Sequence, residues 1–484
     1  MINMSKKQTR MPMQDPAVRN QNFEEVALGY SEEQAIREAM RCLKCRKHPC
    51  MTSGCPVHNH IPEFIAKITE GDFEGAYQVL TQTTSLPAVC GRVCPQYLQC
   101  EGNCVRGKNG GRPVAIGALE RFVADYHRKN NTVATAKTAT KSINGSNNPN
   151  TAYNCDATEH TGSANTDASV AAKKQVAVIG SGPASLACAG DLAEQGFQVT
   201  IFEKENVLGG VLAYGIPQFR LPKEIVENEI EGLKAKGVQI ELGKAAGKDF
   251  TLDELLEQQG FSAVFVGNGA GKPMRLGIPG QEAEGVVSAA DFLAKANLEK
   301  VLPTAKNIAI VGGGNVAMDA CRCAARIPSA EKVSIVYRRS LAEMPADPSE
   351  LKEAMDEGVE VLYLTGPVSV ESEDGKATGL RCQKMALSDP DESGRRKPVP
   401  VPDSEFLLPA DLIIEAIGSG SDNAGLDGVE LSDKKGYVVA DPDTCQSSRK
   451  GVFAGGDTVT GPKTVISAMG AGKKAAKAIA EYLQ

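Results

Sequence analysis

Several features that would place the chain in other classes of protein are missing from its 484 residues. No uninterrupted apolar run approaches the roughly 20 residues that a membrane-spanning helix needs, so we expect no transmembrane segment. Residues 1–15 include basic side chains but not the apolar core of a signal peptide. The formal net charge of −7 gives no support for binding to nucleic acid. These absences, with the thiol content described next, predict a cytoplasmic protein.

Cysteine, in contrast, is concentrated in one short stretch. Eight of the fourteen cysteines lie between residues 42 and 104. The rest of the chain has the pattern of an intracellular nucleotide-binding enzyme, and disulfide scaffolds belong to secreted proteins, so we expect thiolates that bind metal. A proline directly after Cys55 and Cys94 is typical of iron–sulfur ligation. Thiolates suit zinc equally well, so the motif alone leaves both metals open.

These cysteines are set among short helical patterns. Residues 31–34 read as a capping box that opens a helix running to about residue 44, and apolar side chains recur at helical spacing over residues 61–82 and 114–128. Residues 1–30 are polar and contain proline, which predicts an extended arm lying on another domain. We therefore expect a small helical domain over residues 1–129. Residues 130–172 are rich in Asn, Thr, Ala and Ser and predict a linker.

Residues 175–203 have the pattern of a dinucleotide-binding βαβ unit. A buried strand leads into a glycine loop at Gly180, a helix follows, and the next strand ends at Glu203. Gly180 allows the tight turn, and Gly182 lets the backbone approach a pyrophosphate at the helix N-terminus. Glu203 is placed to bind ribose hydroxyls.

A second unit of this kind begins at Asn307. Its loop reads G-x-G-x-x-A, with the expected binding residues Gly312, Gly314, Asn315 and Val316. The strand that follows is succeeded by Arg338 and Arg339 instead of an acid. Because an arginine at this position pairs with a 2′-phosphate, the site favours NADP(H) over NAD(H).

Two further strands, over residues 412–418 and 451–457, are expected to close the first nucleotide domain. The second ends in Gly456-Asp457 and brings a carboxylate and a helix N-terminus near the dinucleotide. The predicted fold is α/β, with two Rossmann-like domains, one inserted in the other, behind the helical domain. The first would span residues 173–285 and 411–484, and the second residues 286–410. The residues expected at the first site are Gly180, Gly182, Pro183, Ala184, Glu203, Gly210, Gly456 and Asp457.

These motifs resemble those of flavoproteins with two dinucleotide-binding domains, in which the first site binds FAD and the inserted one binds NAD(P)H. With the N-terminal cysteine stretches, including Cys42-Leu-Lys-Cys45 and Cys90-Gly-Arg-Val-Cys94-Pro95, the chain is similar to the glutamate synthase small-subunit family. That family includes the N-terminal half of dihydropyrimidine dehydrogenase and the large subunit of NADH-dependent reduced ferredoxin:NADP oxidoreductase. The likeness covers the chain except residues 130–172.

The resemblance implies two [4Fe–4S] clusters with interleaved ligands. A neighbouring redox flavin favours iron–sulfur over zinc, which has no redox role. Cys90 then has no cluster to bind, and His48, His58 and His60 are not expected to be ligands. One cluster would be held by Cys42, Cys45, Cys50 and Cys104, and the other by Cys55, Cys94, Cys100 and an oxygen of Glu120.

The implied activity is electron transfer from NADPH to a partner. Hydride would pass from NADPH to the flavin, and single electrons from there to the clusters. Related disulfide reductases carry a cysteine pair beside the flavin, but here Cys188 stands alone, so electrons must leave by the iron–sulfur domain. No general acid or base is expected. The partner would be a large subunit with an FMN-type substrate-reducing site, which completes glutamate synthase.

Three alternatives remain at this level. The partner of a bifurcating ferredoxin:NADP oxidoreductase would be a small flavin/iron–sulfur subunit, and that of a dihydropyrimidine dehydrogenase would reduce pyrimidines. A zinc-stapled interaction protein is the third alternative, but it would leave two cofactor loops unexplained.

Overall fold

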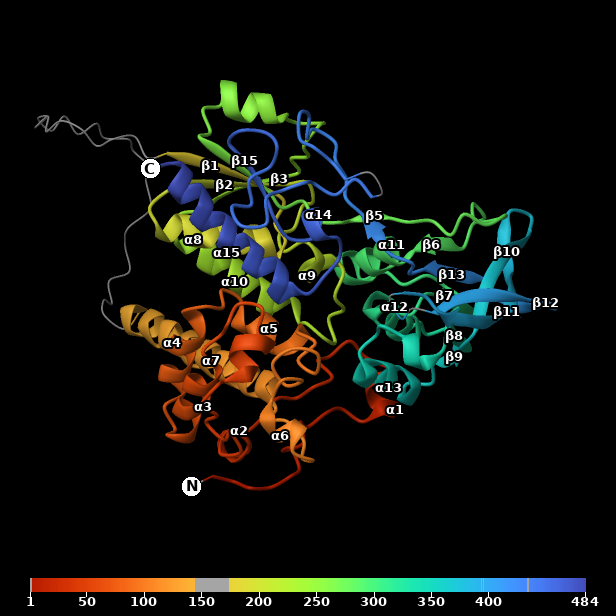
Figure 1. Ribbon diagram of the computed structural model, residues 1–484, viewed down its shortest axis with the longest axis horizontal. Helices are drawn as coiled ribbons and strands as arrows, with labels where there is room; N and C mark the ends of the chain where they lie inside the picture. The colour runs from red at the N-terminus through yellow and green to blue at the C-terminus, as the bar shows by residue number, and fades with distance from the viewer. Residues whose placement is uncertain (1, 144–173, 393, 395, 433–434) are drawn as a thin grey trace, which may run out of the picture.

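Three lobes are visible in the computed structural model, which describes residues 2–143, 174–392, 394, 396–432 and 435–484. The N-terminal residues, red to orange in Figure 1, form a helical lobe. Yellow, light-green and dark-blue segments form a second lobe above it, so the two ends of the nucleotide-binding region meet there. The remaining green, cyan and light-blue segments form a third lobe to the right.

The helical lobe packs short helices around one apolar core. The capping box is confirmed, since the hydroxyl of Ser31 accepts from the backbone of Gln34 and the Gln34 side chain accepts from the backbone of Ser31. The first helix ends at Ala39, before the expected residue 44, because the chain turns inward there to bury Arg41. The helices are α2 (Glu32–Ala39), α3 (Ile61–Thr69), α4 (Phe73–Thr81), α5 (Pro87–Val93), α6 (Val105–Lys108) and α7 (Ile116–Ile143), with a π-helical turn over Cys50–Gly54.

Two boundaries in this lobe differ from the expectation. Residues 61–82 form two helices instead of one, because Gly71 has a φ of 77° and Asp72 caps α4 by accepting from the Gly75 backbone. Helix α7 runs past residue 129 to Ile143, so it enters the stretch that the composition suggested as a linker. The rest of that stretch, from residue 144 to 172, lies outside the described residues.

The N-terminal arm begins on the helical lobe, where the backbone of Asn3 donates to the Met40 carbonyl, and then continues onto the third lobe. It includes the short helix α1 (Pro16–Arg19), which lies beside α13 (Pro348–Asp356) in Figure 1. Arg19 is buried and donates to the carboxylate of Glu357 at 2.8 Å. Further along, the backbone of Val26 donates to the carbonyl of Phe219. The predicted arm therefore contacts both nucleotide-binding lobes.

The second lobe contains a five-stranded parallel sheet in the order β15–β4–β1–β2–β3. Its strands and helices are β1 (Gln175–Ile179), α8 (Pro183–Glu194), β2 (Gln198–Glu203), α9 (Val211–Tyr214), α10 (Lys223–Ala235), β3 (Gln239–Leu242), β4 (Ala263–Val266), β15 (Val452–Ala454), α14 (Asp457–Thr460) and α15 (Val465–Tyr482). The helices α8, α10 and α15 pack together on one face (Figure 1). In this topology the chain leaves β1 for strands on either side, which opens a crevice at the carboxyl ends of β1 and β4.

The third lobe contains a second parallel sheet in the order β6–β13–β7–β8–β9. Its elements are β6 (Val286–Ser288), α11 (Ala289–Ala294), β7 (Asn307–Val311), α12 (Asn315–Ala324), β8 (Lys332–Val336), α13, β9 (Glu360–Leu362) and β13 (Leu412–Glu415). The expectation that residues 412–418 close the first domain was wrong, because β13 pairs with β6 and β7. A fully apolar strand suits the centre of either parallel sheet, so its pattern does not identify the sheet.

An antiparallel sheet projects from the third lobe, at the right of Figure 1. It is formed by β10 (Thr365–Glu373), β11 (Lys376–Pro390) and β12 (Arg396–Pro409), and its inner face packs on β7, β8 and β13. The short pair β5 (Lys272–Pro273) and β14 (Ser419–Gly420) lies where the chain crosses between the two nucleotide-binding lobes. Among the described helices, none combines the length and apolarity that a bilayer crossing requires.

Helices α8 and α15 approach so closely that one glycine is required between them. A Cβ atom at Gly472 would overlap the backbone oxygen of Ala184. We expect Gly472→Ala to lower the free energy of unfolding by about 1–3 kcal/mol, the usual cost of overpacking. Urea denaturation followed by circular dichroism measures the loss. The matched control is Gly232→Ala in α10, where nothing lies within 4 Å of the added atom, and equal loss in both variants would contradict the packing argument.

Candidate functional site

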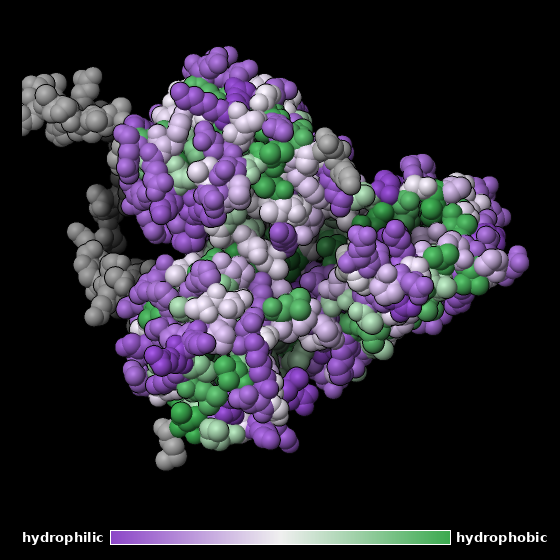
Figure 2. Space-filling view, in the orientation of Figure 1, coloured by the Kyte–Doolittle hydropathy of each residue, from purple (hydrophilic) through white to green (hydrophobic). Residues whose placement is uncertain are grey.

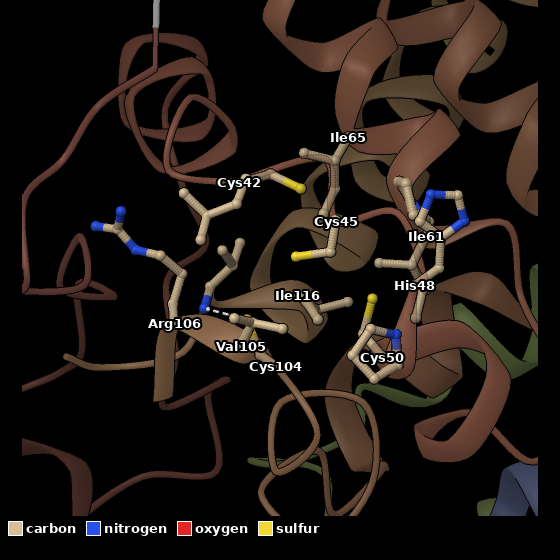
Figure 3. Close-up of a pocket in the computed structure, with 14 residues that line it drawn as sticks. Cys42, Cys45, His48, Cys50, Ile61, Ile65, Cys104, Val105, Arg106 and Ile116 are labelled. Atoms are coloured by element: carbon tan, nitrogen blue, oxygen red, sulfur yellow. Dashed lines mark hydrogen bonds between the residues drawn. The ribbon is translucent and has the colours of Figure 1, made fainter. Parts of the chain in front are cut away.

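Four of the eight clustered cysteines surround one cavity in the helical lobe. The cavity is lined by Cys42, Cys45, Cys50 and Cys104, with apolar walls from Ile61, Ile65 and Ile116. Figure 3 shows the four sulfur atoms turned toward the same space, although Cys104 comes from a loop more than fifty residues further along the chain. We call these four residues the first cysteine set. They are the four that the resemblance assigned to one cluster.

Local backbone conformation turns these thiols inward. Lys44 and His48 have φ values of 48° and 42°, a left-handed conformation that non-glycine residues adopt at a cost, so the loop is held there by its surroundings. The backbone of Val114 donates to the Cys104 sulfur at 3.5 Å, drawn as a dashed line in Figure 3. Burial raises the pKa of the Cys42 thiol, and burial with the neighbouring Cys42 and Cys104 raises that of Cys50 to about 12.

A second set consists of Cys55, Cys94, Cys100 and Glu120. Burial is the main cause of the raised pKa of both Cys55 and Cys100, and the charges of Glu120 and Cys94 add to it. The backbone brings two of these residues together, because a Cβ atom at Gly54, next to Cys55, would come within 2.8 Å of the Cys100 Cα atom. Glu120 projects from α7, and its Oε1 atom is buried without a hydrogen-bond partner. Burial alone raises the pKa of Glu120 to about 8. We call these four residues the second cysteine set.

The orphaned Glu120 oxygen fits an iron–sulfur cluster. A buried carboxylate without a donor costs free energy unless a cation or ligand compensates it, and the thiols of the second set beside it offer such a place. Within the described residues, no three Cys, His, Asp or Glu side chains converge as ligands of one metal ion. Four thiols in the first set, and three thiols with the orphaned carboxylate in the second, are donor sets that fit an iron–sulfur cluster.

The remaining thiol and imidazoles of the lobe have other contacts. Cys90 is fully buried and hydrogen-bonds with Cys94, which contributes most to the strongly raised pKa of the Cys90 thiol. The His58 Nδ1 lies 3.2 Å from the Met51 carbonyl, and the His60 Nδ1 lies 3.0 Å from the Gln82 Oε1. His48 lines the first cavity.

The first glycine loop lies at the crevice of the second lobe. Gly180 has a φ of 88°, and a Cβ atom there would come within 2.8 Å of the Gly267 carbonyl at the end of β4. Gly210 has a φ of 53°, and a Cβ atom there would come within 2.9 Å of the Gly182 Cα atom. Gly182 caps α8, starting with Pro183 and Ala184, and has no atom within 4 Å of where its side chain would be. This open space at a helix N-terminus fits a pyrophosphate.

Two carboxylates border this crevice. Glu203, at the end of β2, is buried and accepts from the Ser181 hydroxyl and, at 2.9 Å, from the Glu205 backbone. Asp457 follows Gly456 at the start of α14, and burial raises its pKa to about 6, although the Lys463 backbone donates to it. Burial raises the pKa of Tyr214 to about 12, and the charges of Glu203, Glu205 and Asp457 add to the shift. Ser181, whose hydroxyl donates to Glu203, is not among the site residues that the sequence predicted.

The second glycine loop has the same geometry in the third lobe. At Gly312 a Cβ atom would overlap the carbonyl of Ala416 at the end of β13, and Gly314 caps α12 with open space around it. Asn315 accepts from the Asp347 backbone at 2.9 Å, and Val316 is half exposed. The strand β13 is thus the neighbour that shapes this loop, as β4 shapes the first.

Arg338 and Arg339 lie just after the carboxyl end of β8. Arg338 is exposed, whereas the Nε of Arg339 is buried and has no hydrogen-bond partner. An unpaired guanidinium donor at the carboxyl end of this strand fits the 2′-phosphate of NADP(H).

The second cysteine set lies against the second lobe, which we call the crevice lobe because it contains the first glycine loop at its crevice. Val57, two residues after Cys55, would be 2.9 Å from a Cβ atom at Gly470 in α15. Gln99, next to Cys100, donates to the Thr464 hydroxyl at the start of that helix, at 3.4 Å. No hydrogen bond of the described residues joins the first cysteine set to α15, so the second set is the one beside the crevice lobe.

Comparisons with known proteins agree with this division. Residues 19–132 match the family described as dihydropyrimidine dehydrogenase domain II, 4Fe-4S cluster. Residues 174–472 match the pyridine nucleotide-disulphide oxidoreductase family. FprA of Mycobacterium tuberculosis, solved in complex with NADPH, has the same fold as 64% of this chain and 85% of its own, with a TM-score of 0.55 and 19% identity.

Several relatives match most of the chain. The NADP(+)-dependent formate dehydrogenase subunit beta of Moorella thermoacetica is 42% identical over 90% of this chain, which spans only 60% of that protein. The glutamate synthase [NADPH] small chain of Halomonas elongata is 35% identical over 98% of this chain and 96% of its own length. That of Escherichia coli is 34% identical with the same coverage. The chain therefore belongs to the pyridine nucleotide-disulphide oxidoreductase family and to the glutamate synthase small-subunit family.

Proposed function

We propose that this protein is the electron-input subunit of an NADPH-dependent glutamate synthase. Electrons from NADPH would pass through FAD and two [4Fe–4S] clusters to a large subunit that forms glutamate. The observation that carries the proposal is the contact of Val57 and Gln99 with α15, because it joins a set of metal-binding groups to the crevice of a flavoprotein fold. The near-complete match to small chains along both lengths supports the same function.

The chain's own residues would bind and orient three kinds of group. When bound, NADPH supplies a hydride, FAD accepts it and releases electrons singly, and [4Fe–4S] clusters carry one electron at a time. Gly180, Gly182 and Gly210 form the pyrophosphate cradle of FAD, and the Glu203 carboxylate faces its ribose. Gly456 and Asp457 approach the same dinucleotide from β15.

The NADPH site and the two cluster sites are assigned from the residues described above. Gly312, Gly314, Asn315 and Val316 surround the NADPH pyrophosphate, and Arg338 with Arg339 bind its 2′-phosphate. Each cysteine set holds one cluster, with Glu120 as the oxygen ligand of the second. No side chain needs to move a proton in hydride transfer, and none is assigned that role.

A second candidate is suggested by the 42% identity to a formate dehydrogenase subunit beta. In that case the same electron path would serve a different partner. The shorter span of the match, 60% of that relative against 96% of the small chains, favours glutamate synthase.

The proposal is tested on the purified chain and its complex. We expect FAD, iron and sulfide in amounts for two cubane clusters, and anaerobic NADPH should bleach the flavin absorbance. Addition of a glutamate synthase large subunit should then give glutamate from glutamine and 2-oxoglutarate. Colourless protein loaded with zinc would contradict the redox function, and an active chain that joins only a formate-oxidising partner would support the second candidate.

The two arginines after β8 should determine the choice between NADPH and NADH. Because a charge-assisted hydrogen bond contributes about 1.5–3 kcal/mol, R338Q/R339Q should lower kcat/KM for NADPH by about 10- to 100-fold and leave that for NADH nearly unchanged. Steady-state oxidation of both nucleotides measures the ratio. Lys332→Gln, at the opposite end of β8, is the control. An equal loss for both nucleotides would refute the assignment.

Glu120 should affect one cluster and not the other. We expect Glu120→Ala to change or remove one of two [4Fe–4S] signals in the electron paramagnetic resonance spectrum of the reduced protein, because only the second set loses an oxygen ligand. Cys90→Ala is the matched control, since that thiol is equally buried beside Cys94 and should leave both signals intact. Two unchanged signals in Glu120→Ala would show that the ligand set is wrong.

A further inference from the structure

Three segments of the helical lobe contain basic residues but no acidic ones. Residues 2–14, 39–62 and 102–119 include ten lysines and arginines and no aspartate or glutamate. The whole chain, in contrast, has 60 acidic and 53 basic residues. Such a local excess of one charge is unexpected in a net acidic protein.

The fold brings these three segments together around the first cysteine set. The buried guanidinium of Arg41 donates to the carbonyls of Ser5, Arg112 and Pro113, at 3.2, 2.6 and 2.8 Å. The backbone of Arg112 also donates to the Lys6 carbonyl at 2.8 Å. Residues from the second and third segments line the cavity itself. The three segments therefore form one surface around the cavity of the first cysteine set.

Eight of the ten basic side chains on this surface are exposed. None of the eight has a carboxylate within 4.0 Å among the described residues, although some exposed lysines elsewhere, such as Lys236 with Glu194 and Lys352 with Asp356, do form ion pairs. The eight residues, which we call the basic rim, are Lys6, Lys7, Arg10, Lys44, Arg46, Lys47, Lys108 and Arg112.

The carboxylates that border these segments form no ion pair with the basic rim. Asp15 caps α1, and Glu120 is buried. Glu38 is buried and paired with Arg41, and Glu101 accepts from the Gln8 side chain and the Gly117 backbone. Glu63, in the first turn of α3, is exposed, but its single negative charge is outnumbered by the eight positive charges of the basic rim. Two apolar side chains, Ile2 and Met4, are 48% and 69% exposed within the same surface. Figure 2 shows apolar, green side chains among purple ones beside the N-terminus, at the lower left.

We propose that the basic rim is the docking surface for an electron-accepting protein that presents an acidic face around its own redox centre. This inference rests on the proposed function, which requires electrons to leave near the first cysteine set. Electron-transfer interfaces are small, and complementary charges steer their encounter more than apolar burial does. An unpaired positive rim around two exposed apolar side chains has that composition.

The test uses two haem proteins of opposite charge as acceptors, acidic cytochrome b5 and basic cytochrome c, with full-length protein and NADPH. Menadione, a small uncharged acceptor, reports electron flow that needs no docking. The variant is K6E/K7E/K108E, which leaves every expected cluster ligand and its chain neighbours unchanged. The matched control is K244E/K248E/K450E, three exposed lysines of the crevice lobe that make no ion pair among the described residues.

For the wild type we expect reduction of cytochrome b5 that slows as salt rises, because screening weakens the attraction. The rim variant should reduce cytochrome b5 about tenfold more slowly and cytochrome c faster, since charge steering changes association rates by about 10- to 1000-fold. Menadione reduction, flavin content and iron content should stay unchanged in both variants. The opposite sign for the two cytochromes separates docking from damage to the fold.

Other outcomes separate the two proposals. If wild type and rim variant reduce both cytochromes equally and without salt dependence, while menadione reduction is normal, the docking surface is wrong and the proposed function stands. If flavin-loaded wild type reduces none of the three acceptors, the proposed function itself fails. If the rim variant loses iron or flavin, the same reduction rates are measured for K6Q/K7Q/K108Q. This variant should also reduce cytochrome b5 more slowly and cytochrome c faster, by a smaller factor, and unchanged rates would contradict the docking surface.

Discussion

The buried carboxylate of Glu357 ties the N-terminal arm to the third lobe. It accepts hydrogen bonds from Arg19 of the arm, from Arg322 of α12 and from Arg326 just after α12, at distances between 2.7 and 3.0 Å. Burial alone would raise its pKa, but these guanidinium groups hold it below its usual value. Arg322 and Arg326 also lie 4.7 and 4.0 Å over the ring of Phe219 from the crevice lobe. One cluster of contacts therefore joins the N-terminal arm to both nucleotide-binding lobes.

Such a cluster determines position more than it adds stability. Burying charges costs much of what their attraction returns, but removal of one partner leaves an uncompensated charge and costs about 3–5 kcal/mol. Next to it, Arg220 of the crevice lobe donates to Asp319 of α12 at 2.7 Å, so the two nucleotide-binding lobes are tied a second time. Cofactors bound at the carboxyl ends of two separate sheets can exchange electrons only if the distance and orientation between the sheets are fixed. The ionic cluster fixes both.

Much of the site could be predicted from the sequence because its signals are local. A glycine turn such as Gly180 or Gly312 can be recognised from the strand before it and the helix after it, although the fold adds a close contact with β4 or β13. The helical character of the N-terminal lobe likewise follows from spacing and from the Ser31 cap. Errors arose where the outcome depended on distant partners. The apolar strand at residues 412–415 could pair with either sheet, and β7 decided it. Ser181 lies within the first glycine loop, but only the fold shows that its hydroxyl donates to Glu203.

The sequence by itself determined the kind of chemistry: thiolates for metal, two glycine loops for dinucleotides, and arginines where an acid would select NAD(H). These follow from residue type and short spacing, which local geometry and charge decide. Tertiary structure decided which groups meet. It brought Cys104 to the cavity of Cys42, left the Glu120 oxygen without a donor beside Cys55, and gathered three acid-free segments into one rim. Each of these needs contacts between residues far apart in the chain, and no local pattern specifies them.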